Sequence, residues 1–292
     1  MNLAILGANS LLGSDFVDHL NDNEIKVFLF SRKTNKGHIT YDKFNKNKYD
    51  VIINFIGAGD PKKIIKEKNT FFETSNYYDE LIISYLRNNK KCKFISISSG
   101  SVLSNFTDPV NISSKTILNL NNLYKESNPY ALTKTYLEIK HRLLKDLNII
   151  DLRVFNYVSC NLEASSSFFI ADIMKCLRDN KQLICSPHEF YRDYIGPKDL
   201  SEILKCIISS KEKNNVFDAY SKKPTSSHVL LSHLEKEFDL NYKFSEDFID
   251  INATGSKSNY FSKNFSLSSL GYEPEFSSLE SISMELKKFL ES

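Results

Sequence analysis

The sequence predicts an α/β fold in which helices cover both faces of a doubly wound parallel sheet. In the first half of the chain, short unbroken apolar runs alternate with segments whose apolar residues recur at helical spacing. Unbroken runs are typical of strands that are buried on both faces, and their alternation with helices is typical of a parallel sheet. Glycine is scarce, with nine residues in 292, yet five of the nine follow three of these runs. We therefore expect the backbone to approach a ligand closely where those strands end.

The expected elements follow one another in a regular order. Strands are expected at Asn2–Leu6, Lys26–Phe30, Asp50–Ile56, Lys93–Ile97 and Ile149–Val154. Amphipathic helices are expected on the stripes Leu12, Phe16 and Leu20, then Tyr78, Leu81, Ile82 and Tyr85, then from about Tyr130 to Leu147. After about residue 157 the elements become shorter. This order predicts a Rossmann-type domain over residues 1–157 and a smaller C-terminal α/β lobe, mainly for substrate, over residues 158–292 and interleaved with the sheet.

The composition argues against several kinds of partner. With 38 Lys and Arg against 36 Asp and Glu, the net charge of +2 gives no reason to expect nucleic acid or an anionic membrane. No window approaches the roughly 18 to 20 apolar residues that a membrane-spanning helix needs. The five cysteines lack Cys-x-x-Cys spacing, and the six histidines lack the spacing of metal ligands. We expect reduced cysteines, no metal site and a cytoplasmic location.

The first chemical motif is the segment GANSLLG, which joins the first expected strand to the first helix. A turn of this kind directs free backbone N–H groups and the positive end of the helix dipole at a pyrophosphate. Gly7 permits a tight turn and Gly13 permits close packing of the helix, whereas Ser10 stands where the usual motif has a middle glycine. An ordinary strand–turn–helix corner is the alternative. The cofactor-binding residues expected here and after the third strand are Gly7, Asn9, Ser10, Leu11, Leu12, Gly13 and Gly57.

The second motif follows the next expected strand. Sites that prefer NAD place Asp or Glu there, to bind the hydroxyl groups of the adenosine ribose. This chain has Ser31, Arg32 and Lys33 instead. A hydroxyl and two cations suit the 2′-phosphate of NADP, because arginine offers a planar fork of donors. We favour NADP with these three residues as ligands, with NAD and a basic turn that binds nothing as the alternatives.

The third motif combines a tyrosine, a lysine and a serine cluster. Tyr130 and Lys134 are four residues apart at the start of the long helix, so their side chains share one face. The lysine charge is expected to lower the pKa of the phenol from its usual value near 10. About 30 residues earlier, Ser98–Ser101 ends the fourth strand, at the edge where open α/β sheets bind ligands. Alone, each motif has a structural alternative, a packed tyrosine or a polar turn. In this order they favour an oxidoreductase.

These segments together resemble the extended short-chain dehydrogenase/reductases, a family of sugar-nucleotide epimerases, dehydratases and reductases. The resemblance runs nearly end to end, through GANSLLG, SSGSVLS, NPYALTKTYLE, RVFNYV, YRDYIGPKDL and LGYEPEFSSLESI. It implies a catalytic set of Ser99, Tyr130 and Lys134, of which Tyr130 and Lys134 also bind the cofactor. It also implies that a nucleotide-linked sugar is bound by Ser99, Gly100, Ser101, Asn156 and Arg192.

One departure from the family pattern narrows the reaction. The family's 4,6-dehydratases carry an Asp-Glu pair directly after the catalytic Ser or Thr, where this chain has Gly100 and Ser101. A site for NADP fits net reduction, because the cofactor then leaves after every turnover. We therefore expect NADPH-dependent reduction of a nucleotide-linked 4-keto sugar, with an NAD-dependent 4-epimerase and a non-catalytic NADP(H) sensor as alternatives. Family members often form dimers, and the apolar residues of Phe72–Leu86 allow a homodimer here.

Overall fold

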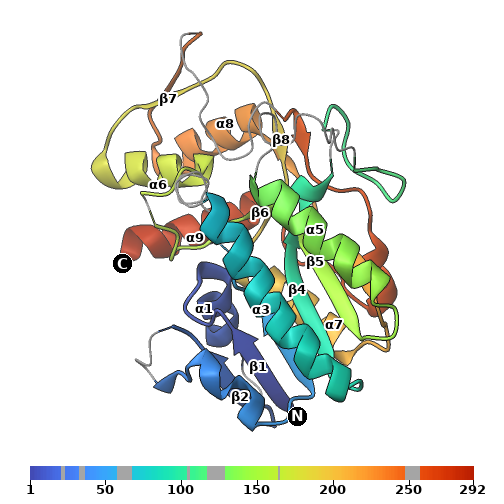
Figure 1. Ribbon diagram of the computed structural model, residues 1–292. Helices are drawn as coiled ribbons and strands as arrows, with labels where there is room; N and C mark the ends of the chain where they lie inside the picture. The colour runs from blue at the N-terminus through green and yellow to red at the C-terminus, as the bar shows by residue number, and fades with distance from the viewer. Residues whose placement is uncertain are drawn as a thin grey trace.

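A parallel sheet of six strands forms the base of the computed structural model (Figure 1). The structure describes residues 1–20, 24–32, 37–57, 68–103, 106–116, 129–163, 165–246 and 257–292. In spatial order the strands are β10 (Asn215–Asp218), β5 (Ile149–Val154), β4 (Lys93–Ser99), β3 (Val51–Asn54), β1 (Asn2–Leu6) and β2 (Lys26–Phe30). All neighbouring strands are parallel. The chain order reverses between β1 and β3, which is the kind of switch point where such sheets bind ligands.

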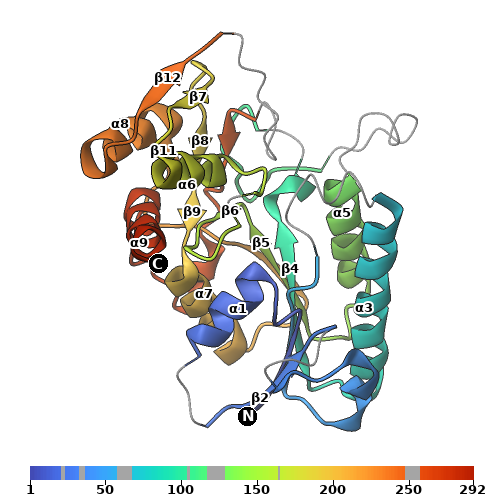
Figure 2. The same cartoon turned by 90° about the vertical axis from the view of Figure 1, so that its left-hand side faces the viewer.

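Helices cover both faces of the sheet, as the sequence predicts. In Figure 2, α1 (Leu11–Asp18) and α7 (Pro197–Ser209) lie on one side, and α3 (Lys68–Asn88) and α5 (Pro129–Leu143) on the other. Successive strand residues point to opposite faces, so Ile53 packs towards α7 while Ile52 packs towards α3. Both are fully buried, which explains why the strands are unbroken apolar runs.

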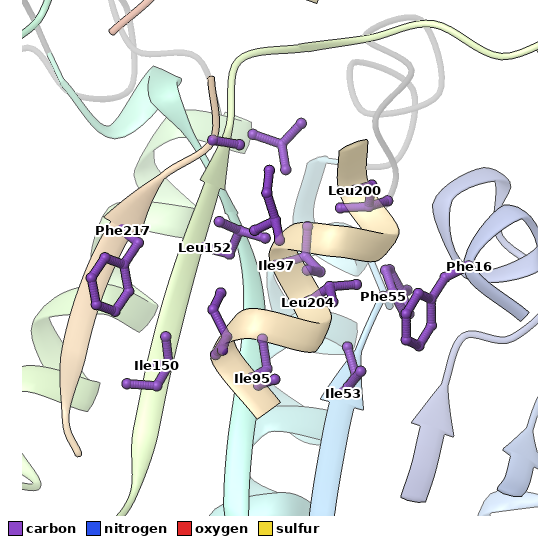
Figure 3. Packing of buried hydrophobic residues seen from close by; sticks show 14 of the residues in the cluster. Phe16, Ile53, Phe55, Ile95, Ile97, Ile150, Leu152, Leu200, Leu204 and Phe217 are labelled. Carbon is purple, nitrogen blue, oxygen red and sulfur yellow. The ribbon is translucent and has the colours of Figure 1, made fainter. Parts of the chain in front are cut away.

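The face under α7 holds the largest apolar cluster (Figure 3). Leu200 and Leu204 of α7 pack on Ile95 and Ile97 of β4, and all but Ile97 are completely inaccessible to solvent. Burying one such side chain stabilises the fold by about 1.5–3 kcal/mol. This packing fixes the position of β4 relative to α7, and therefore the position of the serine cluster at the carboxyl end of β4.

The smaller lobe lies above the carboxyl ends of the strands in Figures 1 and 2. Its helices are α6 (Phe169–Asp179), α8 (Ser227–Phe238) and α9 (Ser278–Glu291). Its strand pairs are β7 (Leu183–Cys185) with β12 (Tyr242–Phe244), β6 (Asn156–Tyr157) with β9 (Tyr194–Ile195), and β8 (Tyr191–Arg192) with both β11 (Thr225–Ser226) and β13 (Asn259–Tyr260). The lobe has its own core, with Met174, Leu234 and Leu286 fully buried.

Short 3₁₀ helices also occur across the chain, at Tyr41–Lys46 (η2), Gly100–Val102 (η3) and Ser266–Leu270 (η4).

Three expected elements end earlier than the sequence indicates. Helix α1 ends at Asp18 rather than near Leu20. The next residue, His19, caps the helix, and its ring contacts the carbonyl oxygen of Asp15. Helix α5 stops at Leu143 rather than Leu147, because the side chain of Asn214 caps its last carbonyl groups. The third strand ends at Asn54, whose side-chain oxygen accepts a hydrogen bond from Ile56 N–H. The division at residue 157 stays a prediction, and both β10 and α7 come from the chain beyond it. Within the part of the chain that the structure describes, no helix is long and apolar enough to cross a bilayer.

Candidate active site

The glycine turn between β1 and α1 is built for a close approach. A Cβ on Gly13 would lie 2.4 Å from the carbonyl oxygen of Gly7, so only glycine lets the helix pack against the turn. Ser10 caps α1, with its hydroxyl oxygen accepting from Gly13 N–H at 3.2 Å. That role explains a serine at the place of the usual middle glycine. The backbone N–H groups of Leu11 and Leu12 precede the first intrahelical hydrogen bonds, and they are the donors that a pyrophosphate needs.

A second glycine leaves space where the cofactor would pass. Gly57 follows β3 with φ +144°, and a Cβ there would lie 3.2 Å from the Lys134 ammonium. A side chain at this position would therefore press on a predicted catalytic residue. Asn9 is exposed beside the turn. These features fit a dinucleotide laid across the switch point of the sheet.

The end of β2 carries an exposed cation. Arg32 is exposed, whereas Ser31 is buried with its hydroxyl 3.2 Å from His38 Nδ1. The Arg32 charge also acts on the phenols of Tyr41 and Tyr78, whose ring centroids are 4.5 Å apart. Lys33 lies outside the residues that the structure describes. Of the two cations predicted to bind a 2′-phosphate, Arg32 is therefore the one that the structure describes, and it is exposed.

The structure brings Ser99, Tyr130 and Lys134 together at the carboxyl edge of β4. The Ser99 and Tyr130 hydroxyl groups are hydrogen-bonded. The Lys134 ammonium lies 5.8 Å from the centre of the Tyr130 ring and donates to Ile97 O at 2.7 Å. Helix α5 presents both side chains to the sheet, because they are one turn apart. The arrangement places a phenol, a hydroxyl and a cation around one point.

Hydrogen-bond partners distinguish Ser99 from its neighbour. The Ser98 hydroxyl donates to Glu138, further along α5, at 2.5 Å. Glu138 also binds Arg153 through both of its oxygens, at 2.7 Å for the shortest contact. Ser98 therefore belongs to a buried polar network that joins β4, α5 and β5.

The expected direction of the Tyr130 pKa is wrong. Burial raises the pKa of Tyr130 above its ordinary value of 10, and the hydrogen bond with Ser99 offsets only part of that rise. Burial also lowers the pKa of Lys134 to about 8, against the charges of Asp151, Asp79 and Glu138. The sequence shows that a lysine is near, but it does not show how far each group is buried. Tyr130 is therefore protonated at neutral pH.

Two of the residues predicted to bind substrate, Gly100 and Ser101, differ in what they contact. The Ser101 hydroxyl is buried without a hydrogen-bond partner among the described residues. A buried unpaired hydroxyl is costly, so a water molecule or a ligand is expected to satisfy it. Gly100 lies directly against the ring of Phe155. Its lack of a side chain therefore serves packing.

Asn156 and Arg192 are held by backbone carbonyl groups. The Asn156 amide donates to Asp193 O at 3.1 Å and to Tyr260 O at 3.3 Å. Arg192 is 3% exposed, and its Nη1 donates to Tyr191 O and Lys257 O, both at 2.8 Å. Both residues therefore position the C-terminal strand β13 beside the site.

Sequence reasoning missed two residues that β13 brings to the site. The Tyr260 hydroxyl lies 3.2 Å from Ser99 Oγ, although 161 positions separate them in the chain. The Lys257 ammonium lies 4.4 Å from the centre of the Tyr260 ring, and burial together with Arg192 lowers the pKa of Lys257 to about 8. Tyr260 lies on a strand of only two residues and Lys257 lies just before that strand, so no sequence periodicity marks either of them.

The comparison with protein families is decisive. The model of the NAD dependent epimerase/dehydratase family matches residues 3–221, about three quarters of the chain. The chain belongs to the NAD dependent epimerase/dehydratase family. This confirms the resemblance stated above and the expectation of an enzyme that uses a nicotinamide dinucleotide. A search of curated proteins gave no significant match.

Solved structures agree on the fold. UDP-glucose 4-epimerase from Thermotoga maritima with UDP-glucose has a TM-score of 0.81 at 17% identity, covering 100% of this chain and 99% of that one. RMD from Pseudomonas aeruginosa complexed with NADPH has a TM-score of 0.78 at 14% identity, covering 99% and 100%. dTDP-glucose 4,6-dehydratase from Bacillus anthracis with NAD has a TM-score of 0.79 at 12% identity, covering 100% and 97%. At such identities the likeness confirms the doubly wound α/β fold and no more.

Proposed function

We propose that this family member reduces a nucleotide-linked 4-keto sugar with NADPH. The observation that carries the choice of reduction is the end of β2, where Arg32 is exposed and no carboxylate follows the strand in the sequence. A cation there suits the 2′-phosphate of NADP, whereas a carboxylate would repel it. Similar structures contain either NADPH or NAD, so the choice of NADPH rests on Arg32.

The cofactor would be held by the elements around the switch point. The turn Gly7–Gly13 and the N-terminus of α1 would bind the pyrophosphate, Arg32 the 2′-phosphate, and Lys134 the nicotinamide ribose. When bound, reduced nicotinamide supplies a hydride to the carbonyl carbon of the substrate. The remaining chemistry belongs to the side chains of this protein.

Tyr130 supplies the proton in this proposal. As the carbonyl carbon gains hydride, its oxygen gains negative charge and takes the Tyr130 hydroxyl proton, which leaves a tyrosinate that solvent reprotonates. Burial keeps Tyr130 protonated beforehand, which is the state that an acid requires. Ser99 donates a hydrogen bond to the same oxygen. The Lys134 charge, 5.8 Å from the ring centre, stabilises the tyrosinate as it forms.

The substrate class rests on the family and on the site. The unpaired Ser101 hydroxyl suits a polyhydroxylated ligand, and structural neighbours include enzymes in complex with UDP-glucose. A 4,6-dehydratase is disfavoured, because Gly100 and Ser101 stand where that subclass carries Asp and Glu. These steps would take place in the cytoplasm.

An NAD-dependent 4-epimerase is the second candidate. It is favoured by several structural neighbours, among them UDP-glucuronic acid 4-epimerase from Bacillus cereus with NAD. In an epimerase Tyr130 must also act as a base. The raised pKa of Tyr130 favours the acid role instead.

We also propose a homodimer through α3 and α5. Five large apolar or aromatic side chains are exposed on these helices, Phe72, Tyr77, Tyr136, Ile139 and Leu143, at 41%, 65%, 41%, 52% and 76%. The Phe72 and Tyr136 rings are 5.4 Å apart, so the exposed residues continue from one helix to the other. Ile139→Glu should convert a dimer to a monomer in analytical ultracentrifugation, and a wild-type monomer would contradict the proposal.

The first test identifies the cofactor. Mass spectrometry of any nucleotide released on denaturation, with fluorescence titration of NADPH and NADH, decides between the two candidates. We expect no retained NAD and preferential binding of NADPH. Arg32→Ala should weaken NADPH binding at least about tenfold and leave NADH binding unchanged. Stoichiometric retained NAD would overturn the reductase in favour of the epimerase.

The second test addresses the reaction. With a panel of nucleotide 4-keto sugars, NADPH oxidation should be saturable in substrate. Tyr130→Phe should lower kcat by about 10²- to 10⁴-fold and leave NADPH binding near normal. Unchanged kcat would contradict the role of Tyr130. Tight NADPH binding without turnover of any sugar would indicate an NADP(H) sensor.

A further inference from the structure

Tyr260 is a buried group beside the reaction point that the proposed mechanism does not use. It lies on β13, and its side chain is 3% exposed. Its hydroxyl lies 3.2 Å from Ser99 Oγ and also contacts the Ser101 backbone. The Tyr260 hydroxyl can have either of two roles here. It can use Ser99 Oγ merely as its own hydrogen-bond partner, or it can determine whether Ser99 donates or accepts its other hydrogen bonds. The hydrogen-bonding capacity of Ser99 distinguishes these two roles.

The serine hydroxyl has one proton to donate and two lone pairs that accept. Ser101 N–H donates to Ser99 Oγ at 3.2 Å. Burial raises the pKa of Tyr260 well above its ordinary value, so its phenol is neutral and always carries a proton. When Tyr260 donates to Ser99, both lone pairs of Ser99 are used. Ser99 can then only donate, towards Tyr130 or towards a substrate oxygen in the same place.

We propose that Tyr260 is a positioning residue, whose hydroxyl fixes Ser99 as the hydrogen-bond donor of the active site. This inference rests on the proposed catalytic role of Ser99. Without the Tyr260 hydroxyl, one lone pair of Ser99 is free to accept from Tyr130. That reversed bond would hold the proton that the substrate oxygen needs and would withdraw the Ser99 donor. Bonds in such a chain also strengthen one another.

The ring of Tyr260 is held firmly enough for this role. Its centroid lies 4.9 Å from that of Phe106 and 5.2 Å from that of Phe155. The Lys257 ammonium lies over the same ring at 4.4 Å. The strand itself is fixed, because Asn259 N–H donates to Phe106 O at 2.8 Å and β13 pairs with β8. Phenylalanine would keep all of these ring contacts and remove only the hydroxyl.

The test measures Tyr260→Phe in two ways. With the active substrate, kcat should fall by about three- to tenfold, the range that one hydrogen bond is worth, and KM should stay within about twofold. Tyr272→Phe is the matched control, because it also removes a buried hydroxyl. That hydroxyl donates to Tyr220 O at 3.0 Å and contacts none of the described active-site residues. Its kcat should be that of the wild type. A Tyr260→Phe variant with wild-type kcat would overturn the proposal.

Two further measurements separate positioning from other effects. In a Ser99→Ala background, Tyr260→Phe should cause no further loss of kcat, because its effect passes through Ser99. An equal loss in both backgrounds would refute the proposal. Carbon-13 NMR of labelled tyrosines, assigned with Tyr130→Phe, reports the Tyr130 pKa without any substrate. Tyr260→Phe should raise this pKa, since Ser99 then ceases to donate to Tyr130. An unchanged pKa would contradict the inference even if the proposed reaction were wrong.

Discussion

Replacing His141 should change how the stability of the protein depends on pH. His141 lies on α5, fully buried between two carboxylates. Its Nδ1 is 2.8 Å from Asp151 and its Nε2 is 2.8 Å from Asp79. Both nitrogens therefore need a proton to donate, and only the imidazolium has two. Burial lowers the pKa of His141, but the charges and hydrogen bonds of Asp151 and Asp79 outweigh burial and raise it to about 10.

The magnitude follows from proton linkage. Histidine ordinarily titrates near 6.5, so between pH 6.5 and about 10 the folded protein holds a proton that the unfolded chain has lost. This stabilisation is complete below pH 6.5 and disappears as the pH rises through about 10. A difference of one pKa unit corresponds to about 1.4 kcal/mol, so the whole effect is at most about 5 kcal/mol. Between about pH 6.5 and about pH 8 the loss should be about 1.5–2 kcal/mol.

The assay is urea unfolding of the wild type and His141→Gln at about pH 6.5 and about pH 8. Glutamine can donate to only one of the carboxylates, so the variant should be about 3–5 kcal/mol less stable at the lower pH. This gap should narrow by about 1.5–2 kcal/mol at the higher pH. Comparing the two proteins cancels the contribution to pH dependence of groups that titrate in both, such as Lys134. His233→Gln, at a half-buried histidine that contacts Ser283 and Glu237, controls for loss of an imidazole. A gap that does not change with pH would mean a neutral His141 and would refute the reasoning.

Two further substitutions test the glycine turn and the substrate side of the site. Gly13→Ala should lower the free energy of unfolding by about 1–3 kcal/mol and weaken NADPH binding, because its Cβ would lie 2.4 Å from Gly7 O. Urea unfolding and fluorescence titration measure both effects, and wild-type values would show that the turn can relax. Ser101→Ala should leave stability unchanged or raised, since its hydroxyl is unpaired, and should raise KM by about three- to tenfold. Lower stability with an unchanged KM would assign Ser101 to the fold.

Much of the fold could be predicted because the strands are buried on both faces. Ile52 and Ile53 point to opposite sides of β3 and both need an apolar residue, so the run itself indicates the strand. The ends of helices were less predictable. The capping of α5 by Asn214 comes from 70 residues away, which no local pattern records.

The candidate site was predicted where neighbours in sequence are neighbours in space. Tyr130 and Lys134 meet because one helical turn joins them. Tyr260 meets Ser99 only through the pairing of β13 with β8. The direction of the Tyr130 pKa was missed for a related reason, since burial depends on packing that the sequence does not display.

The position of β10 in the sheet has a consequence for how the chain folds during synthesis. β5 pairs with β4 on one side and with β10 on the other, and β10 is made only after α6 and α7. Until residues 215–218 leave the ribosome, β5 is an open edge strand, and until α7 is made the sheet lacks its largest apolar cover. A nascent chain stopped at residue 157 would therefore expose a ready template for aggregation. The six-stranded sheet is complete only when the chain has been made as far as residue 218, so residues 1–157 cannot complete it alone.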